Sequence, residues 1–303
     1  MSGRRTIAVA NNIIWIIGCG DIGRRVAGLY LQASSRQSDV NIKAIVSSSA
    51  SKKRCENIGL KAFALDLDSE EISESLSVHN KIENAPLFYF APPPSSGRED
   101  TRLHHFLSSL AHQPRRIVLI STTGVYGDSK GAWIDENFMV NPVADRAHRR
   151  LSAEKTLQQW AKHHHREYII LRVPGIYAKD RLPLARLKKG LPVVNRNEAA
   201  WTNRIHADDL AMVCKTAMES AISGEIYNVT DGQPSTMTDY FNRVADYAGL
   251  ARPPQISMQE AETTLSAGMV SYLRESRRIR HAKMLKELHV TLQYPSLKDG
   301  LRI

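Results

Sequence analysis

The stretch Ile13-Ile14-Trp15-Ile16-Ile17-Gly18-Cys19-Gly20-Asp21-Ile22-Gly23-Arg24-Arg25-Val26-Ala27 decides the fold of this chain. Five apolar residues, most of them β-branched, run directly into a Gly-x-Gly-x-x-Gly pattern, and a sequence compatible with a helix follows. A strand, a tight turn and a helix in this order form the first unit of a dinucleotide-binding fold.

Each glycine of the pattern has a separate physical role. Gly18 lets the chain turn sharply off the strand, Gly20 leaves room for a pyrophosphate, and Gly23 lets the helix lie close to the sheet. Asp21 and Ile22 open the helix, whose unpaired N–H groups would face the phosphates. A glycine-rich surface turn is the alternative, and the apolar strand before the pattern and the helical pattern after it argue against that alternative.

Length, composition and charge indicate one enzyme-sized globular protein. The chain has 303 residues, of which 42% are hydrophobic and 24% are charged, so it can bury a full core. Its net charge of +10 comes from scattered Lys and Arg, and no motif of a nucleic-acid recognition module is present. An anionic small molecule such as a dinucleotide is a less demanding explanation of this charge than nucleic acid or a membrane surface, so we expect a small-molecule substrate and no nucleic-acid partner. We also expect a monomer or homodimer.

The cysteines and histidines show no metal-binding pattern. Cys19, Cys55 and Cys214 are isolated and odd in number, as in a reduced cytoplasmic protein. The run at residues 163–165 consists of three histidines without carboxylate or cysteine companions, which indicates a solvated helix end. No apolar run approaches the roughly 20 residues that cross a bilayer. We therefore expect no metal, no membrane partner and a cytoplasmic location.

Strands and helices alternate through the first half of the chain. This alternation predicts an α/β fold, a doubly wound parallel sheet or Rossmann fold with a small C-terminal substrate lobe. We expect an NAD(P)-binding domain over residues 1–172 and a mixed C-terminal region over residues 173–303, in which residues 201–231 return to the core. The expected strands cover residues 13–17, 41–46, 62–67, 87–91, 116–120 and 167–172.

The end of the second strand is the place where such a fold selects its cofactor. An acidic residue there would hold the ribose hydroxyls of NAD, whereas hydroxyl and basic residues accept a 2′-phosphate. Ser47 and Ser48 follow the strand, Lys52 and Arg54 come next, and no acid is present. This composition favours NADP(H) over NAD(H), although a solvated basic helix start would look the same.

Ligands of open parallel sheets bind at the carboxyl ends of the strands. The third strand ends at Asp66 and Leu67, and the fourth ends at Ala91, Pro92 and Pro93. We expect these five residues to line the cofactor site.

The motifs, in their order along the chain, resemble those of the extended short-chain dehydrogenase/reductase superfamily, in its NAD-dependent epimerase/dehydratase branch. The resemblance covers nearly the whole chain and implies a nicotinamide cofactor that also contacts Val173. It rests on Gly18 to Gly23, Asp66-Leu67, Ser121-Thr122-Thr123-Gly124-Val125-Tyr126-Gly127, Leu171-Arg172-Val173-Pro174-Gly175-Ile176-Tyr177, Asn203 to Leu210, and Tyr227-Asn228-Val229-Thr230-Asp231.

The resemblance also places the family's catalytic positions. A Ser or Thr four residues before the Tyr of the Val-Tyr-Gly element binds the reacting oxygen and the cofactor, and Thr122 stands there. Counting back from Glu154, the family's Tyr-x-x-x-Lys pair falls on Arg146 and Arg150. The chain therefore resembles atypical members that have lost this pair, because arginine stays protonated and cannot replace the tyrosine as a general acid/base.

Thr122, Arg146 and Arg150 are accordingly predicted to stabilise negative charge on a reacting oxygen. A proton would come from water, from the substrate or from His148, and Tyr126 is a second candidate. The residues expected to contact the substrate are Thr123, Tyr126, Ile176, Tyr177, Arg181 and Arg204.

Two functions follow from these observations. In the first, the protein is an enzyme that acts on a small anionic or sugar-like substrate as a reductase, epimerase or dehydratase. In the second, it binds NADP(H) without turnover, as a sensor or scaffold. The C-terminal lobe retains the motif-bearing segments of the family, which favours an enzyme. Arg146 and Arg150 in place of the Tyr and Lys pair favour a protein that binds the cofactor without turnover.

Overall fold

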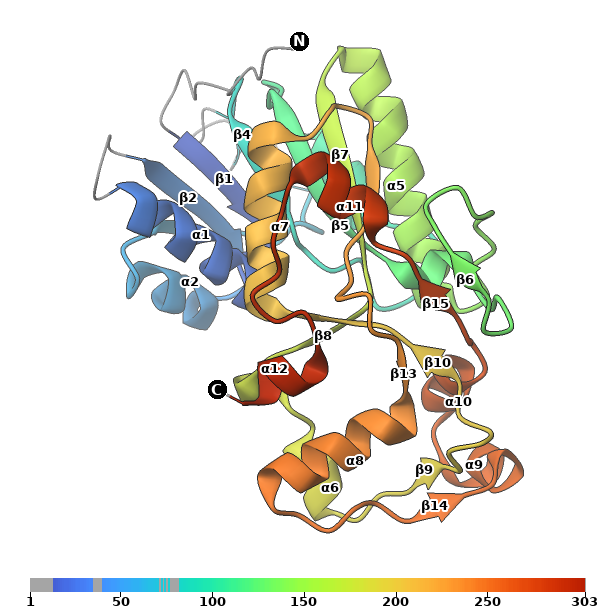
Figure 1. Cartoon of the computed structure of the whole chain (residues 1–303). Coiled ribbons are helices and arrows are strands. Elements are labelled where there is room, and N and C mark those ends of the chain that lie inside the picture. Colours follow the sequence, from blue (N-terminus) through green and yellow to red (C-terminus); the bar gives the residue numbers. More distant parts are fainter. Residues whose placement is uncertain are drawn as a thin grey trace.

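The computed structural model describes residues 13–34, 40–70, 72, 74, 76 and 82–302. A seven-stranded sheet forms its centre in the order β12-β7-β5-β4-β1-β2-β3, and all neighbouring strands are parallel (Figure 1). The predicted doubly wound Rossmann fold is confirmed, since the strand order reverses beside β1. The strands are β1 (Ile13–Ile17), β2 (Asn41–Val46), β3 (Lys61–Ala64), β4 (Pro86–Tyr89), β5 (Arg116–Thr122), β7 (Glu167–Val173) and β12 (Ile226–Asn228).

The sheet is buried on both faces, which explains its continuous apolar strands. Along β1, Ile14 and Ile16 belong to one hydrophobic core, and Trp15 and Ile17 belong to the other. Successive side chains of a strand point to opposite faces, so one strand contributes to both cores.

Helices cover each face of the sheet. The first core takes residues from α1, α7 and α11, which lie on the near side in Figure 1, and the second takes residues from α4 and α5. The bounds of these helices, and of α2 beside β2 and β3, are α1 (Asp21–Ser34), α2 (Ser49–Glu56), α4 (Thr101–Ser108), α5 (Asp145–His164), α7 (Ala207–Ser220) and α11 (Ala282–Leu288).

A smaller lobe lies below the carboxyl edge of the sheet in Figure 1. The chain enters it after β7 and returns through β11, α7 and β12. The boundary expected at residue 172 stays a prediction. The remaining elements are η1 (Thr123–Tyr126), β6 (Trp133–Ile134), β8 (Gly175–Tyr177), η2 (Lys179–Arg181), α6 (Leu184–Lys188), β9 (Val193–Val194), β10 (Trp201–Thr202), β11 (Arg204–His206), β13 (Ser235–Thr236), α8 (Met237–Ala248), β14 (Gln255–Ile256), α9 (Met258–Thr264), α10 (Ala267–Leu273), β15 (Arg278–Ile279) and α12 (Leu297–Leu301).

His206 stands where β11 passes into α7. Its ring is buried, with its centroid 3.8 Å from that of Tyr294 and 5.2 Å from that of Tyr177. The Nδ1 atom accepts a hydrogen bond from the Asp208 N–H at 3.2 Å and so caps the helix. Since an accepting nitrogen carries no proton, this cap requires a neutral imidazole, and burial lowers the pKa of His206.

This histidine predicts a pH dependence of stability. Its folded pKa lies below its unfolded value of about 6.5, so its contribution is complete above that pH and is lost as the pH falls toward the folded pKa. We expect the free energy of unfolding to drop by up to about 1.4 kcal/mol per pH unit in that window. His206→Asn keeps a capping acceptor and should flatten this slope in urea unfolding between pH 5 and 7.5. An unchanged slope would contradict the assignment.

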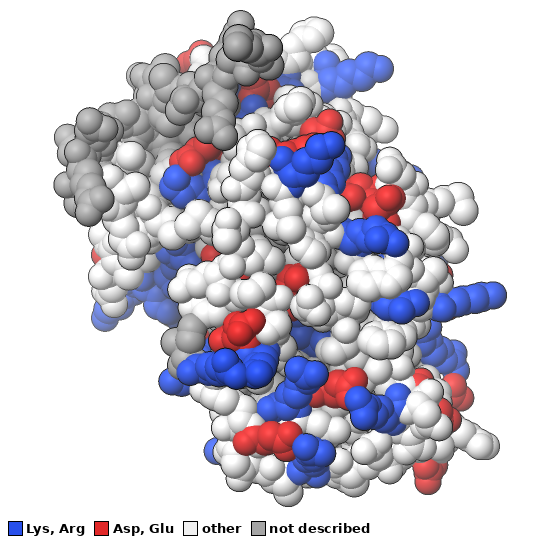
Figure 2. Space-filling model, in the orientation of Figure 1, with Lys and Arg blue, Asp and Glu red and all other residues white. Residues whose placement is uncertain are grey.

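On the face seen in Figure 2, Lys and Arg and Asp and Glu are scattered among uncharged residues. Among the described residues, no helix combines the length and apolarity needed to span a membrane. The same residues contain no group of three or more His, Cys, Asp or Glu arranged to hold a metal ion.

Candidate functional site

The glycine-rich turn between β1 and α1 has the geometry that its sequence predicts. Gly18 has a φ of +76°, and a Cβ there would lie 2.3 Å from the Ala91 backbone nitrogen. A Cβ on Gly23 would lie 3.0 Å from the Ile16 Cγ2 atom, so the helix packs closely on the strand. By contrast, the nearest atom to a Cβ on Gly20 is the Gly18 oxygen at 3.9 Å, which leaves open space in front of this turn. The turn can therefore admit a ligand at Gly20.

Asp21 would place a negative charge beside that space, but two arginines neutralise it. Its Oδ1 accepts from Arg25 Nε at 3.1 Å, and its Oδ2 accepts from Arg181 Nη1 at 2.7 Å. Partial burial raises the pKa of Asp21, yet the bonds from the two arginines outweigh it and hold this pKa below its usual value. Arg181, predicted to contact a substrate, thus ties the connection after β8 to the turn.

The end of β2 carries the residues predicted to select the cofactor. Ser48 caps α2 by accepting from the Ser51 N–H at 3.3 Å, and Arg54 Nη2 donates to Ser51 Oγ at 2.6 Å. Lys52 lies 3.7 Å from Glu56 one helical turn later, and Ser47 is exposed. A hydroxyl and guanidinium cluster therefore follows β2.

The residues predicted after β3 and β4 lie at the same edge of the sheet. Leu67 and Ala91 are buried, and the Asp66 carboxylate accepts from the Asp68 N–H at 3.0 Å. Arg102 joins the two strand ends, because it pairs with Asp68 and also donates to the Pro92 oxygen at 2.7 Å.

A cavity of about 420 Å³ opens between this edge and the smaller lobe. One wall comes from the ends of β4, β5 and β7 and from the first turns of α5, and the opposite wall comes from β10, α10 and the segment before β15. Its lining consists of Pro93, Ile120, Ser121, Thr122, Thr123, Gly124, Arg146, Ala147, Arg150, Val173, Pro174, Gly175, Ile176, Trp201, Thr202, Asn203, Tyr272, Glu275 and Arg277. Its size lies in the range of small-molecule sites.

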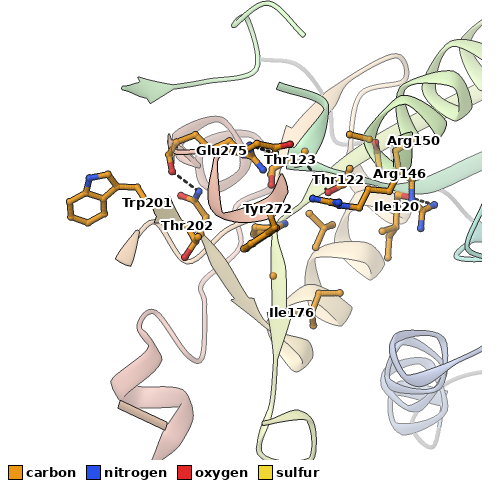
Figure 3. A pocket seen from close by; sticks show the side chains of 18 of the residues that line it. Ile120, Thr122, Thr123, Arg146, Arg150, Ile176, Trp201, Thr202, Tyr272 and Glu275 are labelled. Carbon is orange, nitrogen blue, oxygen red and sulfur yellow. Dashed lines mark hydrogen bonds and ion pairs between the residues drawn. The ribbon is translucent and has the colours of Figure 1, made fainter. Parts of the chain in front are cut away.

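The cavity contains all three residues predicted to be catalytic. In Figure 3, Arg146 and Arg150 lie at one end, with Thr122 next to them. Arg150 donates from Nη1 to the Ile120 oxygen at 3.1 Å, and burial lowers its pKa, although arginine remains a cation at neutral pH. The Arg146 side chain makes no hydrogen bond or ion pair with another described residue. Its guanidinium is therefore available to an anion.

Thr122 and Thr123 stand where β5 passes into η1. Thr122 Oγ1 accepts from the Gly124 N–H at 3.2 Å, which leaves its own proton available for donation. Thr123 is buried and also lines the cavity, as do the predicted residues Val173 and Ile176.

The wall from the smaller lobe contains residues that the sequence analysis did not single out. Trp201 and Thr202 come from β10, Tyr272 lies in the last turn of α10, and Glu275 and Arg277 follow that helix. Glu275 and Arg277 are two residues apart in the irregular segment before β15, and Arg277 Nη1 donates to Glu275 Oε2 at 2.7 Å. The two-residue spacing of an acidic and a basic residue is the signal in the sequence that could have indicated this ion pair.

The other predicted substrate residues do not line the cavity. Tyr126 is buried and donates to Asn228 Oδ1 at 2.8 Å, and Tyr177 donates to the Ser296 oxygen at 3.1 Å. Arg204 is buried against the Tyr240 ring at 4.0 Å and donates to Ser235 Oγ at 2.9 Å. These contacts hold the polar ends of the three side chains within the protein.

These elements define an α/β protein of the Rossmann class with a cavity between its sheet and a second lobe. Residues 100–230 match the model of the NAD dependent epimerase/dehydratase family. Over these residues the match confirms the predicted resemblance to the NAD-dependent epimerase/dehydratase branch.

Three similar proteins have been characterised by sequence or structure. Protein YeeZ from Escherichia coli K12 is 24% identical over 243 residues, which cover 78% of this chain and 81% of YeeZ. A functionally unknown conserved protein from Silicibacter pomeroyi is 26% identical and superposes with a TM-score of 0.76 over 95% of this chain and 96% of that one. DesIV, a dTDP-glucose 4,6-dehydratase from Streptomyces venezuelae solved with NAD and TYD bound, has a TM-score of 0.77 at 17% identity, covering 95% and 94% of the two chains.

Proposed function

We propose that this protein is a nicotinamide-dependent oxidoreductase or epimerase-like enzyme that acts on a small anionic substrate. The observation that carries the proposal is the cavity lined by Thr122 and two arginines at the carboxyl edge of the sheet, the edge at which the glycine-rich turn follows β1. The family match and the NAD bound to DesIV support a nicotinamide cofactor.

The described residues fit such a cofactor. The open space at Gly20 and the N-terminus of α1 suit a pyrophosphate, since that helix end presents unpaired N–H groups and a partial positive charge. The ends of β2, β3 and β4 would hold the adenosine half, and Pro93, Thr122 and Val173 would adjoin the nicotinamide half.

A bound nicotinamide ring supplies a carbon that accepts or donates a hydride. The chain's own residues would orient the substrate and stabilise charge. Thr122 can donate its proton to a reacting oxygen, and Arg146 and Arg150 can stabilise negative charge on that oxygen or bind an anionic group. The low polarity contributed by Ile120 and Ile176 strengthens these interactions.

Arginine at both positions of the usual Tyr and Lys pair favours the second candidate, a protein that binds the cofactor without turnover. Neither Arg146 nor Arg150 can exchange a proton at neutral pH. In this case the cavity would serve a sensor or a scaffold.

Titration with NADPH and NADH, followed by nicotinamide fluorescence, tests cofactor binding. Adding a panel of nucleotide sugars and small carbonyl acids then tests turnover. Loss of NADPH absorbance detects a net reduction, and chromatography of the products detects an epimerisation or dehydration, which regenerate the cofactor. Cofactor binding with turnover of one compound supports the enzyme, binding with no turnover across the panel supports the silent binder, and no binding of either cofactor excludes both.

We further propose that NADP(H) is preferred over NAD(H), on the strength of the Ser48, Ser51 and Arg54 cluster after β2. Arg54→Ala should weaken NADPH binding about tenfold and leave NADH binding unchanged, because a guanidinium bond to a 2′-phosphate is lost. Lys53→Ala, which removes an equal charge from the same helix, is the control. Equal affinity of the unmodified protein for both cofactors would contradict this preference.

A further inference from the structure

Glu275 is the acidic residue in the lining of the cavity, and its carboxylate is only half satisfied. Its Oε2 accepts from Arg277 Nη1 at 2.7 Å, whereas its Oε1 is buried with no hydrogen-bond partner among the described residues. The side chain is 5% exposed. Burying a carboxylate oxygen without a hydrogen-bond donor costs free energy, because the oxygen loses its bonds to water. A ligand that donates a hydrogen bond to this oxygen removes that cost.

The surroundings hold this carboxylate firmly in place. Arg277 also donates from Nη1 to the Gly127 oxygen at 2.6 Å, and its backbone N–H donates to the Trp201 oxygen at 3.1 Å. Asn203 Nδ2 donates to the Arg277 oxygen at 3.0 Å. Rigid support of this kind is typical of a binding group rather than of a mobile surface residue.

Glu275 lies in the wall of the cavity that the smaller lobe contributes, opposite the ends of the sheet strands. It comes from the segment before β15, together with Tyr272 of α10, while Thr122 and Arg146 belong to the wall built on the sheet. Figure 3 shows Glu275 and Thr202 toward one end of the cavity and Arg146 and Arg150 toward the other. A ligand that spans the cavity therefore meets Arg146 and Arg150 at one end and the Glu275 carboxylate, paired with Arg277, at the other.

We propose that Glu275 is a substrate-binding residue that accepts a hydrogen bond from a hydroxyl group, so that the cavity selects small hydroxylated acids. This inference rests on the proposed function and names its substrate class. The acidic group of the ligand would lie at Arg146, and the hydroxyl would donate to Glu275 Oε1. Acids of the same length without a hydroxyl leave that oxygen unsatisfied and are discriminated against.

The test compares hydroxylated acids with their deoxy partners in equilibrium binding by calorimetry, with and without nicotinamide cofactor. The pairs are gluconate and hexanoate, 3-hydroxybutyrate and butyrate, and glycerol 3-phosphate and propyl phosphate. The unmodified protein should bind the hydroxylated member of at least one pair about tenfold more tightly, which is the size of one hydrogen bond to a charged group. In Glu275→Gln this preference should fall at least threefold, because the charged acceptor is lost while the amide oxygen can still accept from Arg277.

Glu262→Gln is the matched control, since Glu262 forms an exposed ion pair with Arg274 in the same lobe but outside the cavity. It should leave the preference unchanged. No preference in the unmodified protein, or equal weakening of both members of a pair in Glu275→Gln, would overturn the inference and leave Glu275 a structural partner of Arg277. The preference of the unmodified protein is measured even if the variant does not fold.

Cofactor titration separates this result from the proposed function. If the cofactor binds and no hydroxylated acid is preferred, only the role of Glu275 fails. If no cofactor binds, the proposed function fails, and the calorimetry without cofactor still decides whether Glu275 recognises a hydroxyl.

Discussion

Arg172→Met is expected to lower the free energy of unfolding by about 3–5 kcal/mol, because it leaves a buried carboxylate without its partner. Arg172 of β7 donates from Nε to Glu154 Oε1 at 3.1 Å and from Nη2 to Oε2 at 2.7 Å. The two side chains are 6% and 2% exposed. Ser121 Oγ donates to the same carboxylate, so the pair joins β5, β7 and α5 directly beneath the cavity. Urea unfolding monitored by circular dichroism measures the loss.

The same substitution at a surface pair is the control. Arg252 and Asp246 form an ion pair with side chains 64% and 49% exposed, so Arg252→Met should lower the free energy of unfolding far less than Arg172→Met does. Adding Glu154→Leu to Arg172→Met removes the orphaned charge and should recover a large part of the stability. A loss in Arg172→Met no greater than in Arg252→Met would show that the buried pair is not required.

The sheet could be predicted from the sequence because its signals are local. Both faces of the sheet are covered, so its strands are continuous apolar runs that end at glycine, serine or proline, as at Gly18 and Pro92. The strand β12 has only three residues, Ile226–Asn228, and was not predicted as a strand. Three residues are too few to show the alternation of apolar and polar side chains that indicates a strand. The pairing of β12 with β7 joins segments far apart in the sequence, so local sequence does not reveal it.

The candidate site could be predicted only on its sheet side. The sequence motifs fix the positions of β5 and α5, and these elements contain the three predicted catalytic residues Thr122, Arg146 and Arg150. Glu275 lies more than a hundred residues further along the chain and reaches the cavity through a lobe of short helices and two-residue strands. Arg204 and Tyr126, polar in sequence and predicted to bind substrate, are instead held by Ser235 and Asn228. Their residue types do not reveal whether a protein group or a ligand satisfies them.

The glycine-rich turn allows a test of the cofactor site that does not disturb the fold. Gly20→Ala should weaken NADPH binding about thirtyfold or more, because the added methyl group occupies the space a pyrophosphate needs to reach the backbone N–H groups, each worth about 1.5–3 kcal/mol. No described atom lies within 3.9 Å of that methyl position, and Gly20 does not have the positive φ that strains other residues. Its free energy of unfolding should therefore change by less than about 1 kcal/mol.

Gly28→Ala adds the same methyl group within α1, the helix that follows Gly20, at a position with no atom beyond the helix's own backbone within 4 Å. It should leave NADPH binding unchanged and stabilise the helix by about 0.5–1 kcal/mol, since alanine is the better helix former. Fluorescence titration of both variants, with urea unfolding of each, distinguishes a steric block at the turn from a general loss of structure. If Gly20→Ala binds NADPH as tightly as Gly28→Ala does, the phosphates do not approach this turn. The glycines would then serve only the close packing seen at Gly18 and Gly23.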